Sequence, residues 1–324
     1  MIRSFVFDQG KLVGENVELD ALPLLWADKG LHVWVDLEAP TPEETKRVLE
    51  DVLKFHPLAI EDCVQPSPLP KVDDYETYLF MVIHGVDFNR ADGVFATAEL
   101  NLFMSSDYLV TYHEQPLKSV TATMERVRKN APPIPRAPDR LMHTLLDLLF
   151  ENYRPALEEL SLETSELEHR ALTKPSGQIL NNVLALKKEV THLRQIISPQ
   201  REVIARLARG DFKYIRAHLR PYFRDILDLL RRISDRADAY HDSLNSVLQI
   251  HLSMQQQQTN QVIKVLTLVT VITLPAIMIA SWYGMNFTEQ MPELHSRWGY
   301  VGVIIATWTV TALIAAFFKW RKWF

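Results

Sequence analysis

The residues best suited to binding chemistry are Gly284, Met285 and Asn286, which follow an apolar run from Val265 to Trp282. Gly284 lets the backbone open at a helix end and expose its carbonyl oxygens, and Asn286 adds an uncharged amide oxygen. Such oxygens suit a divalent cation that gives up its waters reluctantly, whereas a ring of carboxylates would hold the ion too firmly for release. The three residues therefore predict an ion-selectivity site, and a plain helix cap at Asn286 is the alternative.

One face of the preceding helix has side chains that suit a narrow, partly wet passage. Hydroxyls tolerate water, and large aliphatic side chains form a constriction of the kind that gates by excluding water. Hydroxyls in membrane helices also bond to their own backbone carbonyls, so the sequence leaves open which of them face a pore. The candidate pore-lining residues are Ser281, Ile277, Leu274, Thr270 and Leu266, with Thr267 and Ile263 nearby.

Two groups of acidic residues could draw cations towards such a passage. Glu289 and Glu293 lie just after the motif, where rings of charge would attract cations, although acids are common on any surface. Six glutamates also lie on a predicted helix further back in the chain, which is most simply a solvated face and alternatively a negative rim near a pore mouth. They are Glu151, Glu158, Glu159, Glu163, Glu166 and Glu168.

Two long apolar segments position the motif. No charged residue lies between Lys264 and Glu289, and a second apolar run extends from Trp298 to Phe318. A hydrocarbon core of about 30 Å needs roughly 20 apolar residues in a helix, and each run supplies them. They predict two transmembrane helices joined by a short external loop. The alternative, a pair of helices buried in a soluble core, is disfavoured by uncharged spans with basic flanks.

The charges beside the spans predict their orientation. Lys264 precedes the first span, and Lys319, Arg321 and Lys322 follow the second, whereas the connecting loop has more acidic than basic residues. The positive-inside rule therefore places both termini in the cytoplasm.

The first 113 residues are typical of a mixed α/β domain. Runs of strand length occur at 2–7, 31–37, 75–88, 94–104 and 108–113, and the short turns between the last three predict an antiparallel sheet. Thr41, Pro42 and Glu44 predict a capped helix that runs to about Lys54, and His56 begins another short helix. A cluster of prolines near residue 135 then ends the domain.

The remaining soluble part is predicted to be helical. We expect helices from Leu141 to about Leu172 and from Ile179 to Ile197, with the second ending near Pro199. No proline or glycine interrupts the chain between Pro221 and Pro275, so one helix is expected to run from Pro221 into the first membrane span. Pro275 is expected to loosen that helix in mid-membrane.

This long helix has a heptad pattern that predicts packing against other helices. Two spans per chain cannot enclose a polar pathway alone, so we expect a symmetric homo-oligomer, with Leu230 and Leu244 at its interface. The heptad positions are Ile226, Leu230, Ile233, Ala237, Tyr240, Leu244, Val247, His251 and Met254.

The predicted fold class is an α+β cytoplasmic domain followed by a long helical stalk and two C-terminal transmembrane helices. The expected division is an α/β domain (1–138), a helical region whose stalk begins at about 221 (139–261), the first transmembrane helix (262–287), an external loop (288–297), the second transmembrane helix (298–318) and a basic tail (319–324).

With these features in place, the chain resembles the CorA family of divalent-cation transporters. The resemblance rests on Gly284-Met285-Asn286 after the first span, on Met291-Pro292-Glu293-Leu294 in the loop, and on the aromatic and basic C-terminal tail. The segments His56-Pro57-Leu58 with Glu61-Asp62, and Pro221 to Asp225, also look like family segments, so the resemblance covers nearly the whole chain. The family often has a threonine where this chain has Ile277, and the loop here is one residue longer.

The resemblance implies a channel for Mg²⁺ that passes Co²⁺ or Ni²⁺ less readily, assembled as a pentamer in a bacterial-type inner membrane. It also implies that Mg²⁺ bound between subunits on the cytoplasmic side closes the pore. Asp62 and Asp225 match the acids of that regulatory metal site, and Asn286 matches the selectivity residue. Gln249 stands where some relatives have another acid, which leaves open whether the regulation is retained.

Composition and motifs exclude several other classes. The net charge of −5 disfavours a nucleic-acid partner, and a single cysteine excludes an internal disulfide. The chain has no nucleotide-binding Gly-rich loop and no His-Glu-x-x-His motif, so we expect no enzyme. Two alternatives remain: a zinc transporter of the same superfamily, which Met285 disfavours and which would be proton-coupled, and a membrane-anchored sensor that would have no need of an amide motif.

Overall fold

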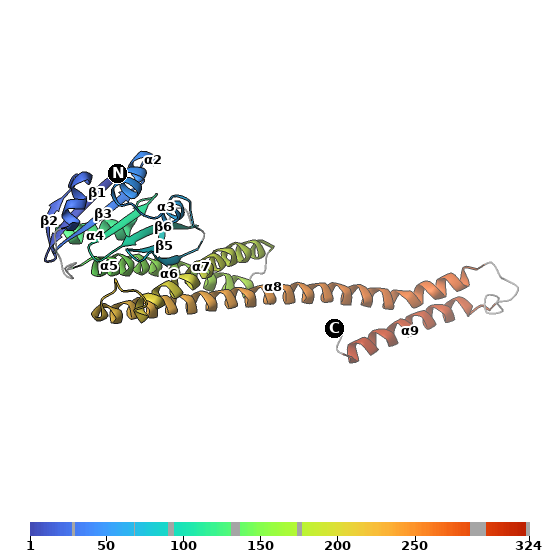
Figure 1. Cartoon of the computed structure of the whole chain (residues 1–324). Helices are drawn as coiled ribbons and strands as arrows, with labels where there is room; N and C mark the ends of the chain where they lie inside the picture. Colours follow the sequence, from blue (N-terminus) through green and yellow to red (C-terminus); the bar gives the residue numbers. More distant parts are fainter. Residues whose placement is uncertain are drawn as a thin grey trace. The chain divides into compact units, whose positions relative to one another are not determined.

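The computed structural model describes residues 1–27, 30–67, 69–89, 94–130, 137–173, 177–285 and 296–321. Within them the chain divides into two units, Met1–Leu248 and Gln249–Phe324. The first unit is a mixed sheet with helices on both faces, and the second is formed by two apolar helices (Figure 1). The α+β fold class, the long helix and the two C-terminal helices are confirmed.

Seven strands form one sheet in the order β2-β1-β3-β7-β6-β5-β4. Every neighbouring pair is antiparallel except β3 and β7, which are parallel, so the antiparallel pairing expected of the last three predicted strands is confirmed. The strands are β1 (Ile2–Asp8), β2 (Lys11–Glu15), β3 (Leu31–Glu38), β4 (Lys71–Asp74), β5 (Leu79–Asn89), β6 (Val94–Met104) and β7 (Tyr108–His113).

The strand expected at 75–88 begins later than its composition suggests. The chain turns back between β4 and β5, where the backbone N–H of Tyr75 bonds to the carbonyl of Tyr78. Glu76 adopts a φ of 62°, a left-handed conformation that no strand residue has. The aromatic side chains of this turn favour a strand by propensity, but the tight turn that pairs β4 with β5 overrides that preference.

The helix starts predicted in the N-terminal half are confirmed. The Thr41 hydroxyl accepts from the backbone N–H of Glu44 while the Glu44 carboxylate accepts from that of Thr41, a complete capping box. The helix α2 (Pro42–Thr45) continues as a π-helical segment, Lys46–Val52. Helix α3 (Pro57–Val64) begins at His56, whose ring nitrogen Nδ1 accepts from the N–H of Leu58. The 3₁₀ turn Leu19–Ala21 and α1 (Leu22–Ala27) come earlier.

Alternation along the strands divides the core between the two faces of the sheet. In β5, Leu79, Met81 and Ile83 face one hydrophobic cluster, whereas Phe80 and Val82 face the other. Helices α1 and α3 cover the second face, and the helices after β7 cover the first (Figure 1). The sheet is therefore the middle layer of three, and α3 and the later helices lie on opposite sides of it.

In the described residues, four α-helices lie between β7 and the long helix, and two of their limits differ from expectation. They are α4 (Lys118–Arg128), α5 (Pro138–Glu151), α6 (Tyr153–Thr173) and α7 (Gly177–Arg209). The helix expected over 141–172 is interrupted at Asn152, because Pro155 has no N–H to donate and is tolerated only in the first turn of a new helix. The buried Tyr153 hydroxyl fixes this break by donating to the carbonyl of His84.

The end expected near Pro199 is wrong, because α7 continues through Pro199 to Arg209. An interior proline costs about 3 kcal/mol or more. Packing offsets that cost: Leu193 and Ile197 before the proline and Ile204 and Leu207 after it are all buried in the same core. Burial of each such side chain contributes roughly 1.5–3 kcal/mol, so continuing the helix past the proline is favoured.

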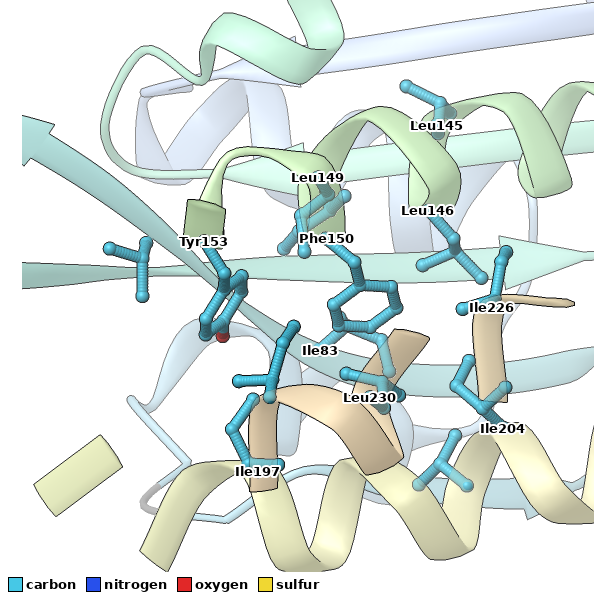
Figure 2. Packing of buried hydrophobic residues seen from close by; sticks show 14 of the residues in the cluster. Ile83, Leu145, Leu146, Leu149, Phe150, Tyr153, Ile197, Ile204, Ile226 and Leu230 are labelled. Atoms are coloured by element: carbon cyan, nitrogen blue, oxygen red, sulfur yellow. The ribbon is translucent and has the colours of Figure 1, made fainter. Parts of the chain in front are cut away.

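The heptad positions in the first part of helix α8 (Arg220–Tyr283) pack against helices of the same chain. Leu230, Ile233 and Leu244 are at most 2% exposed and belong to the same cluster as α5, α6 and α7. Figure 2 shows Ile226 and Leu230 against Phe150, Ile197 and Ile204. The expectation that Leu230 and Leu244 form an oligomer interface is therefore wrong: packing against other helices is confirmed, but those helices belong to the same subunit.

The second unit consists of the C-terminal part of α8 and helix α9 (Gly299–Trp320). Each contains an 18-residue window of mean hydropathy above 2, and 6% and 0% of these windows is buried. A core helix of a soluble protein would bury its apolar residues, so the alternative of two buried soluble helices does not describe this chain. Both helices have the length and composition to cross a membrane.

A buried ionic network lies where β3 and β7 run parallel. Asp36, Glu38 and His113 come within 4.8 Å of one another, close enough to hold a metal ion. The protein's own groups already serve them, because the Arg3 guanidinium lies 3.0 Å from Glu38 and 3.9 Å from Asp36. Thr111 donates a hydrogen bond of 2.5 Å to Asp36. The cluster is therefore an ion-pair network.

His113 provides the second positive charge of this network. Its Nδ1 faces the carbonyl of Gln115 at 2.6 Å and its Nε2 faces the Asp36 carboxylate at 3.2 Å, so both nitrogens have acceptors and both must carry protons. Burial alone would lower the pKa of His113, but the hydrogen bonds to Asp36 and Gln115 outweigh it and raise that pKa. Two cations then balance two carboxylates.

The internal position of the seam predicts a loss of stability when it is truncated. Leu230→Ala should destabilise the first unit by about 2–5 kcal/mol, because it leaves a cavity in a packed core. Urea unfolding of the full-length protein in detergent, followed by near-ultraviolet circular dichroism, measures the effect. Leu162→Ala, at an exposed position of α6, is the matched control and should change stability by less than about 0.5 kcal/mol. If Leu230→Ala left the stability unchanged but made the oligomer smaller, Leu230 would lie at an interface between subunits after all.

The raised pKa of His113 predicts a pH dependence with a definite sign. A group whose pKa is higher in the folded state stabilises that state below its unfolded pKa of about 6.5, and the stabilisation is lost as pH rises through the folded value. The wild type should therefore lose unfolding free energy from pH 6 upwards, relative to His113→Gln. That variant should be less stable at pH 6 by on the order of 3 kcal/mol, because Asp36 loses its partner. A constant difference between the two proteins from pH 6 to 9 would contradict the imidazolium assignment, and exposed His169→Gln serves as the control.

Candidate functional site

The five candidate pore-lining residues lie on one exposed face of α8. Leu266 is 65% exposed and Ile277 62%, and Thr270, Leu274 and Ser281 are exposed as well. The half-buried positions of the same segment, Val271, Pro275 and Ile279, fall on the opposite side of the helix. The single chain therefore leaves the candidate face uncovered, as a face that lines a passage or meets a neighbouring subunit must be, and its role stays a prediction.

The hydroxyl groups on this segment bond to their own helix. Thr270 donates 2.9 Å to the carbonyl of Leu266, and Thr267 and Thr273 make the equivalent bonds one turn back. The sequence left open whether these hydroxyls face a pore or bond to their own backbone, and at Thr270 the bond to the backbone is present. Its oxygen keeps acceptor capacity for a water, so the bond removes a donor from the candidate face but leaves an acceptor. Helix α8 continues through Pro275, which has no N–H for the carbonyl of Val271.

The selectivity motif begins where α8 ends. Gly284 donates its N–H to the carbonyl of Ala280 at 2.9 Å, and Met285 is 45% exposed. A Cβ at position 284 would lie 3.1 Å from the Ala280 oxygen, so glycine fits this turn without strain. Asn286, Glu289 and Glu293 lie outside the residues that the structure describes, and their predicted roles therefore stay predictions.

The first of the two cytoplasmic acids, Asp62, lies on α3 and is already paired. Its carboxylate bonds to the Lys71 ammonium, and Asp73 approaches the same ammonium at 3.7 Å. The Asp62 side chain is 38% exposed. Lys71 thus compensates this carboxylate within the chain, and a metal ion at Asp62 would have to compete with the lysine or draw it aside.

The second acid, Asp225, lies in the second turn of α8 and is exposed. Burial raises the pKa of the Asp147 carboxyl on α5, and the negative charge of Asp225 raises it further. Burial and the charge of Arg140 lower the pKa of the neighbouring His143 to about 4, so this histidine is neutral at pH 7 and adds no positive charge. The charges of Arg126 and Arg140 oppose the rise at Asp147, so the two carboxylates at the junction of α5 and α8 are compensated only in part.

Sequence reasoning missed Asp147. The signal was available, because Asp147 is the single acid within Leu145-Leu146-Asp147-Leu148-Leu149 and sits on a helix that is otherwise apolar at this point. Its proximity to Asp225 arises only from the fold, which packs α5 against α8.

The structure brings together Asp147 and Asp225 but does not bring Asp62 to them within one chain. Among the described residues, the charged groups near Asp62 are Lys71, Asp73 and Glu99, whereas Asp225 lies near Asp147 of α5. A metal site containing both Asp62 and Asp225 therefore requires two copies of the chain. Gln249 lies on α8 and is exposed, and its neutral amide adds no carboxylate to such a metal site.

The glutamates of α6 form an acidic face together with α7. Burial, Glu159 and Glu166 raise the pKa of the Glu163 carboxyl, and burial and Glu163 raise that of Glu189 on α7. Arg170 pairs with Glu166 at 3.5 Å, and Ser243 of α8 donates to Glu168. The acids are thus close enough to repel one another, and most of them are exposed, as the solvated-face interpretation requires.

Comparison with protein families gives one match that covers most of the chain. Residues 30–321 match the model of the CorA-like Mg²⁺ transporter protein family. The match includes the α/β part from β3 onwards, the long helix, the motif and both apolar helices.

Individual relatives agree with this match. The chain is 30% identical to the putative metal ion transporter YfjQ of Bacillus subtilis over 90% of its own length and 89% of the relative. It is 29% identical to the cobalt/magnesium transport protein CorA of Thermotoga maritima, over 93% of this chain and 86% of that protein.

Solved structures support the same fold. The complete CorA magnesium transporter of Methanocaldococcus jannaschii matches with a TM-score of 0.82 and 20% identity, over 99% of this chain and 98% of that one. The cytoplasmic domain of ZntB from Vibrio parahaemolyticus also matches, with a TM-score of 0.59 and 12% identity over 70% of this chain and 88% of that domain. At these identities the likeness concerns the fold alone.

Proposed function

The chain belongs to the CorA-like Mg²⁺ transporter family, and from this membership we propose that it is a homo-oligomeric channel for Mg²⁺ that also passes Co²⁺ and, less readily, Ni²⁺. The observation that carries the proposal is the family match over residues 30–321, which includes both apolar helices and the motif at 284–286. The family is one of transporters and not of enzymes. The flow of ions follows their gradient and the membrane potential across a bacterial-type inner membrane, with both termini in the cytoplasm.

The oligomer is required by the geometry of two helices per chain. Two helices cannot surround a polar path in lipid, whereas α8 helices arranged around a symmetry axis can. We propose a pentamer, in line with the family resemblance. The exposed face of Leu266, Thr270, Leu274, Ile277 and Ser281 supports this arrangement, because it is uncovered in the single chain. Leu274 and Ile277 then form the apolar constriction, and Glu289 and Glu293 line the external approach.

Selectivity arises at Gly284, Met285 and Asn286. A ring of Asn286 amide oxygens, one from each subunit, accepts hydrogen bonds from the waters of a hydrated ion. Neutral oxygens bind the ion weakly enough to let it leave, as conduction demands. For this role, the motif must lie at the external end of the first membrane helix.

Regulation is proposed to act through Mg²⁺ held between subunits on the cytoplasmic side. Asp62 of one subunit faces Asp225 and Asp147 of the next, so that three carboxylates share one ion when cytoplasmic Mg²⁺ is high. The ion replaces Lys71 as the partner of Asp62 and relieves the repulsion between Asp147 and Asp225. Subunits joined in this way hold the pore closed, and loss of the ion releases them.

A zinc transporter driven by a proton gradient is the second candidate. The fold shared with the ZntB cytoplasmic domain is the observation that keeps it in view. Oxygen ligands at the motif favour Mg²⁺ over Zn²⁺, which prefers nitrogen and sulfur ligands.

Ion flux into liposomes tests the function and the selectivity site together. Mg²⁺ influx into vesicles containing the purified protein should follow membrane potential and ignore a pH gradient. Asn286→Ala should reduce it at least about tenfold with the oligomer intact, because the hydrated ion loses its acceptors. Asn260→Ala, before the first span, should leave it unchanged. Zn²⁺ influx that rises with an inward proton gradient, in the absence of Mg²⁺ flux, would favour the second candidate.

Inhibition of this flux by Mg²⁺ on the cytoplasmic side tests the regulatory site. Asp225→Ala and Asp147→Ala should each raise the Mg²⁺ concentration needed for half-inhibition by roughly tenfold, since each removes one carboxylate ligand. Asp228→Ala, one turn further along α8 at an exposed position, is the matched control. Equal inhibition of all four proteins would leave Asp147 and Asp225 as ordinary surface acids.

A further inference from the structure

A small cavity lies between the C-terminal end of α3 and the strands β6 and β7, away from the sites discussed above. Its volume is about 120 Å³, enough for an ion that keeps several waters. We call it the acceptor cavity, and the lining residues that matter here are Glu99, Asn101, Glu114, Tyr112 and Cys63. Among the described residues that line it, none is a lysine, an arginine or a histidine.

Asn101 leaves a buried acceptor without a partner in this cavity. The residue is 2% exposed. Its amide nitrogen donates to the carbonyl of Cys63 at 3.4 Å and to the Glu99 carboxylate at 2.9 Å. These two bonds fix the orientation of the amide, and its oxygen Oδ1 has no hydrogen-bond partner in the part of the chain that the structure describes. A buried, unsatisfied acceptor costs about 1–3 kcal/mol, so the site calls for a donor or a cation.

Two carboxylates line the same cavity. Asn101 pairs with Tyr112 at the end of the antiparallel ladder of β6 and β7. Glu99 comes two residues before Asn101 in β6, and Glu114 follows directly after the last residue of β7. Both carboxylates lie close enough to Cys63 for their charges to raise the pKa of its thiol. The Glu114 carboxylate is exposed but oriented, because the Tyr112 hydroxyl donates to its Oε1 at 2.6 Å.

The described neighbours balance the charge of Glu99 only in part. The backbone N–H of Ser67 donates to its Oε2 at 2.9 Å. His84 lies 4.0 Å from the Glu99 carboxylate, but its Nε2 proton is directed to the carbonyl of Ser67, and burial lowers the pKa of this histidine. Lys71 is shared with Asp62 and Asp73. Burial raises the pKa of the Glu99 carboxyl, and the hydrogen bonds from Asn101 and Ser67 and the charge of Lys71 oppose that rise without cancelling it.

We propose that the acceptor cavity binds a hard divalent cation of the Mg²⁺ type within a single subunit. Asn101 Oδ1, Glu114 Oε2 and an oxygen of Glu99 supply the ligands, and water completes the shell. One or two carboxylates with several retained waters are the usual environment of Mg²⁺ in proteins. Softer metals that require a thiolate do not fit, since burial and the charges of Glu99 and Glu114 keep the Cys63 thiol protonated by raising its pKa.

The position of the cavity links it to α3. The carbonyl of Cys63 is held by Asn101, and Asp62 is the residue before it. A cation bound to Asn101 and Glu99 therefore fixes the end of α3, and with it Asp62, against the sheet. This consequence for Asp62 rests on the proposed function, whereas the cation site itself does not.

Counting bound Mn²⁺ in the full-length protein in detergent tests the proposal. Mn²⁺ has the ligand preference of Mg²⁺, and electron paramagnetic resonance reports its free concentration. Glu114→Gln should bind one Mn²⁺ fewer per chain than the wild type, or bind that ion at least tenfold more weakly. Glu125→Gln, an exposed glutamate on α4, is the matched control and should equal the wild type. Equal counts and affinities in all three proteins would overturn the proposal.

Anomalous scattering from crystals grown with Mn²⁺ locates the ion. A peak between Asn101 Oδ1 and Glu114 supports the proposal, and peaks confined to other places overturn it. Asp225→Ala separates this site from the regulatory one. If Asp225→Ala loses a Mn²⁺ and Glu114→Gln does not, the regulatory site stands and the cavity site fails. If Glu114→Gln loses a Mn²⁺ while liposomes show no Mg²⁺ flux, the cavity site stands and the channel function fails.

Discussion

The packing of one face of α8 against α5, α6 and α7 is the constraint on which the rest of the first unit depends. Leu230, Ile233 and Leu244 are completely or almost completely buried there, and the strand β5 reaches the same core through Ile83. This contact fixes which residues of α8 point outwards, and Asp225 is one of them. It also places Asp225 beside Asp147, a pairing that neither helix has alone. The heptad pattern is thus used for building the subunit, and assembly must use other surfaces.

The two ends of helix α8 have surfaces suited to different surroundings, one to water and the other to an apolar environment. Up to Leu248 most of its apolar residues are buried and most of its charged residues are exposed, the arrangement of a helix in water. Beyond Lys264 the relation reverses, because Leu266, Leu274 and Ile277 are exposed and no charge follows until Glu289. Water would penalise that surface by about 25 cal/mol for each Å² of exposed apolar area, whereas lipid or a neighbouring helix would not. The change in pattern along a single uninterrupted helix therefore marks where the solvent changes.

Local sequence signals predicted the elements well, and long-range packing accounts for the differences. The capping box at Thr41, the strands at 94–104 and 108–113 and the uninterrupted α8 follow from residues close together in the chain. Pro199 misled because its cost is offset by core contacts on both sides of it. The parallel pairing of β3 with β7 joins segments about seventy residues apart, which turn patterns cannot reveal. Asp147 was missed for the same reason, since its partner Asp225 is on another helix.

Carboxylates at three points on and beside the sheet differ in how their charge is compensated. Asp36 is served by Arg3 and an imidazolium at His113, so its charge is balanced inside the subunit. Asp62 has Lys71, a flexible side chain that can move aside for a stronger cation. Glu99 has the backbone N–H of Ser67 and shares the charge of Lys71 with Asp62 and Asp73, and Glu114 has the Tyr112 hydroxyl. Among the described residues, the amide oxygen of Asn101 beside them has no partner. Since the cost of a buried charge falls steeply once a counter-charge is present, an ion gains least at the first point and most at the third. Incomplete compensation, rather than the number of acids, therefore identifies where this protein has room for a cation.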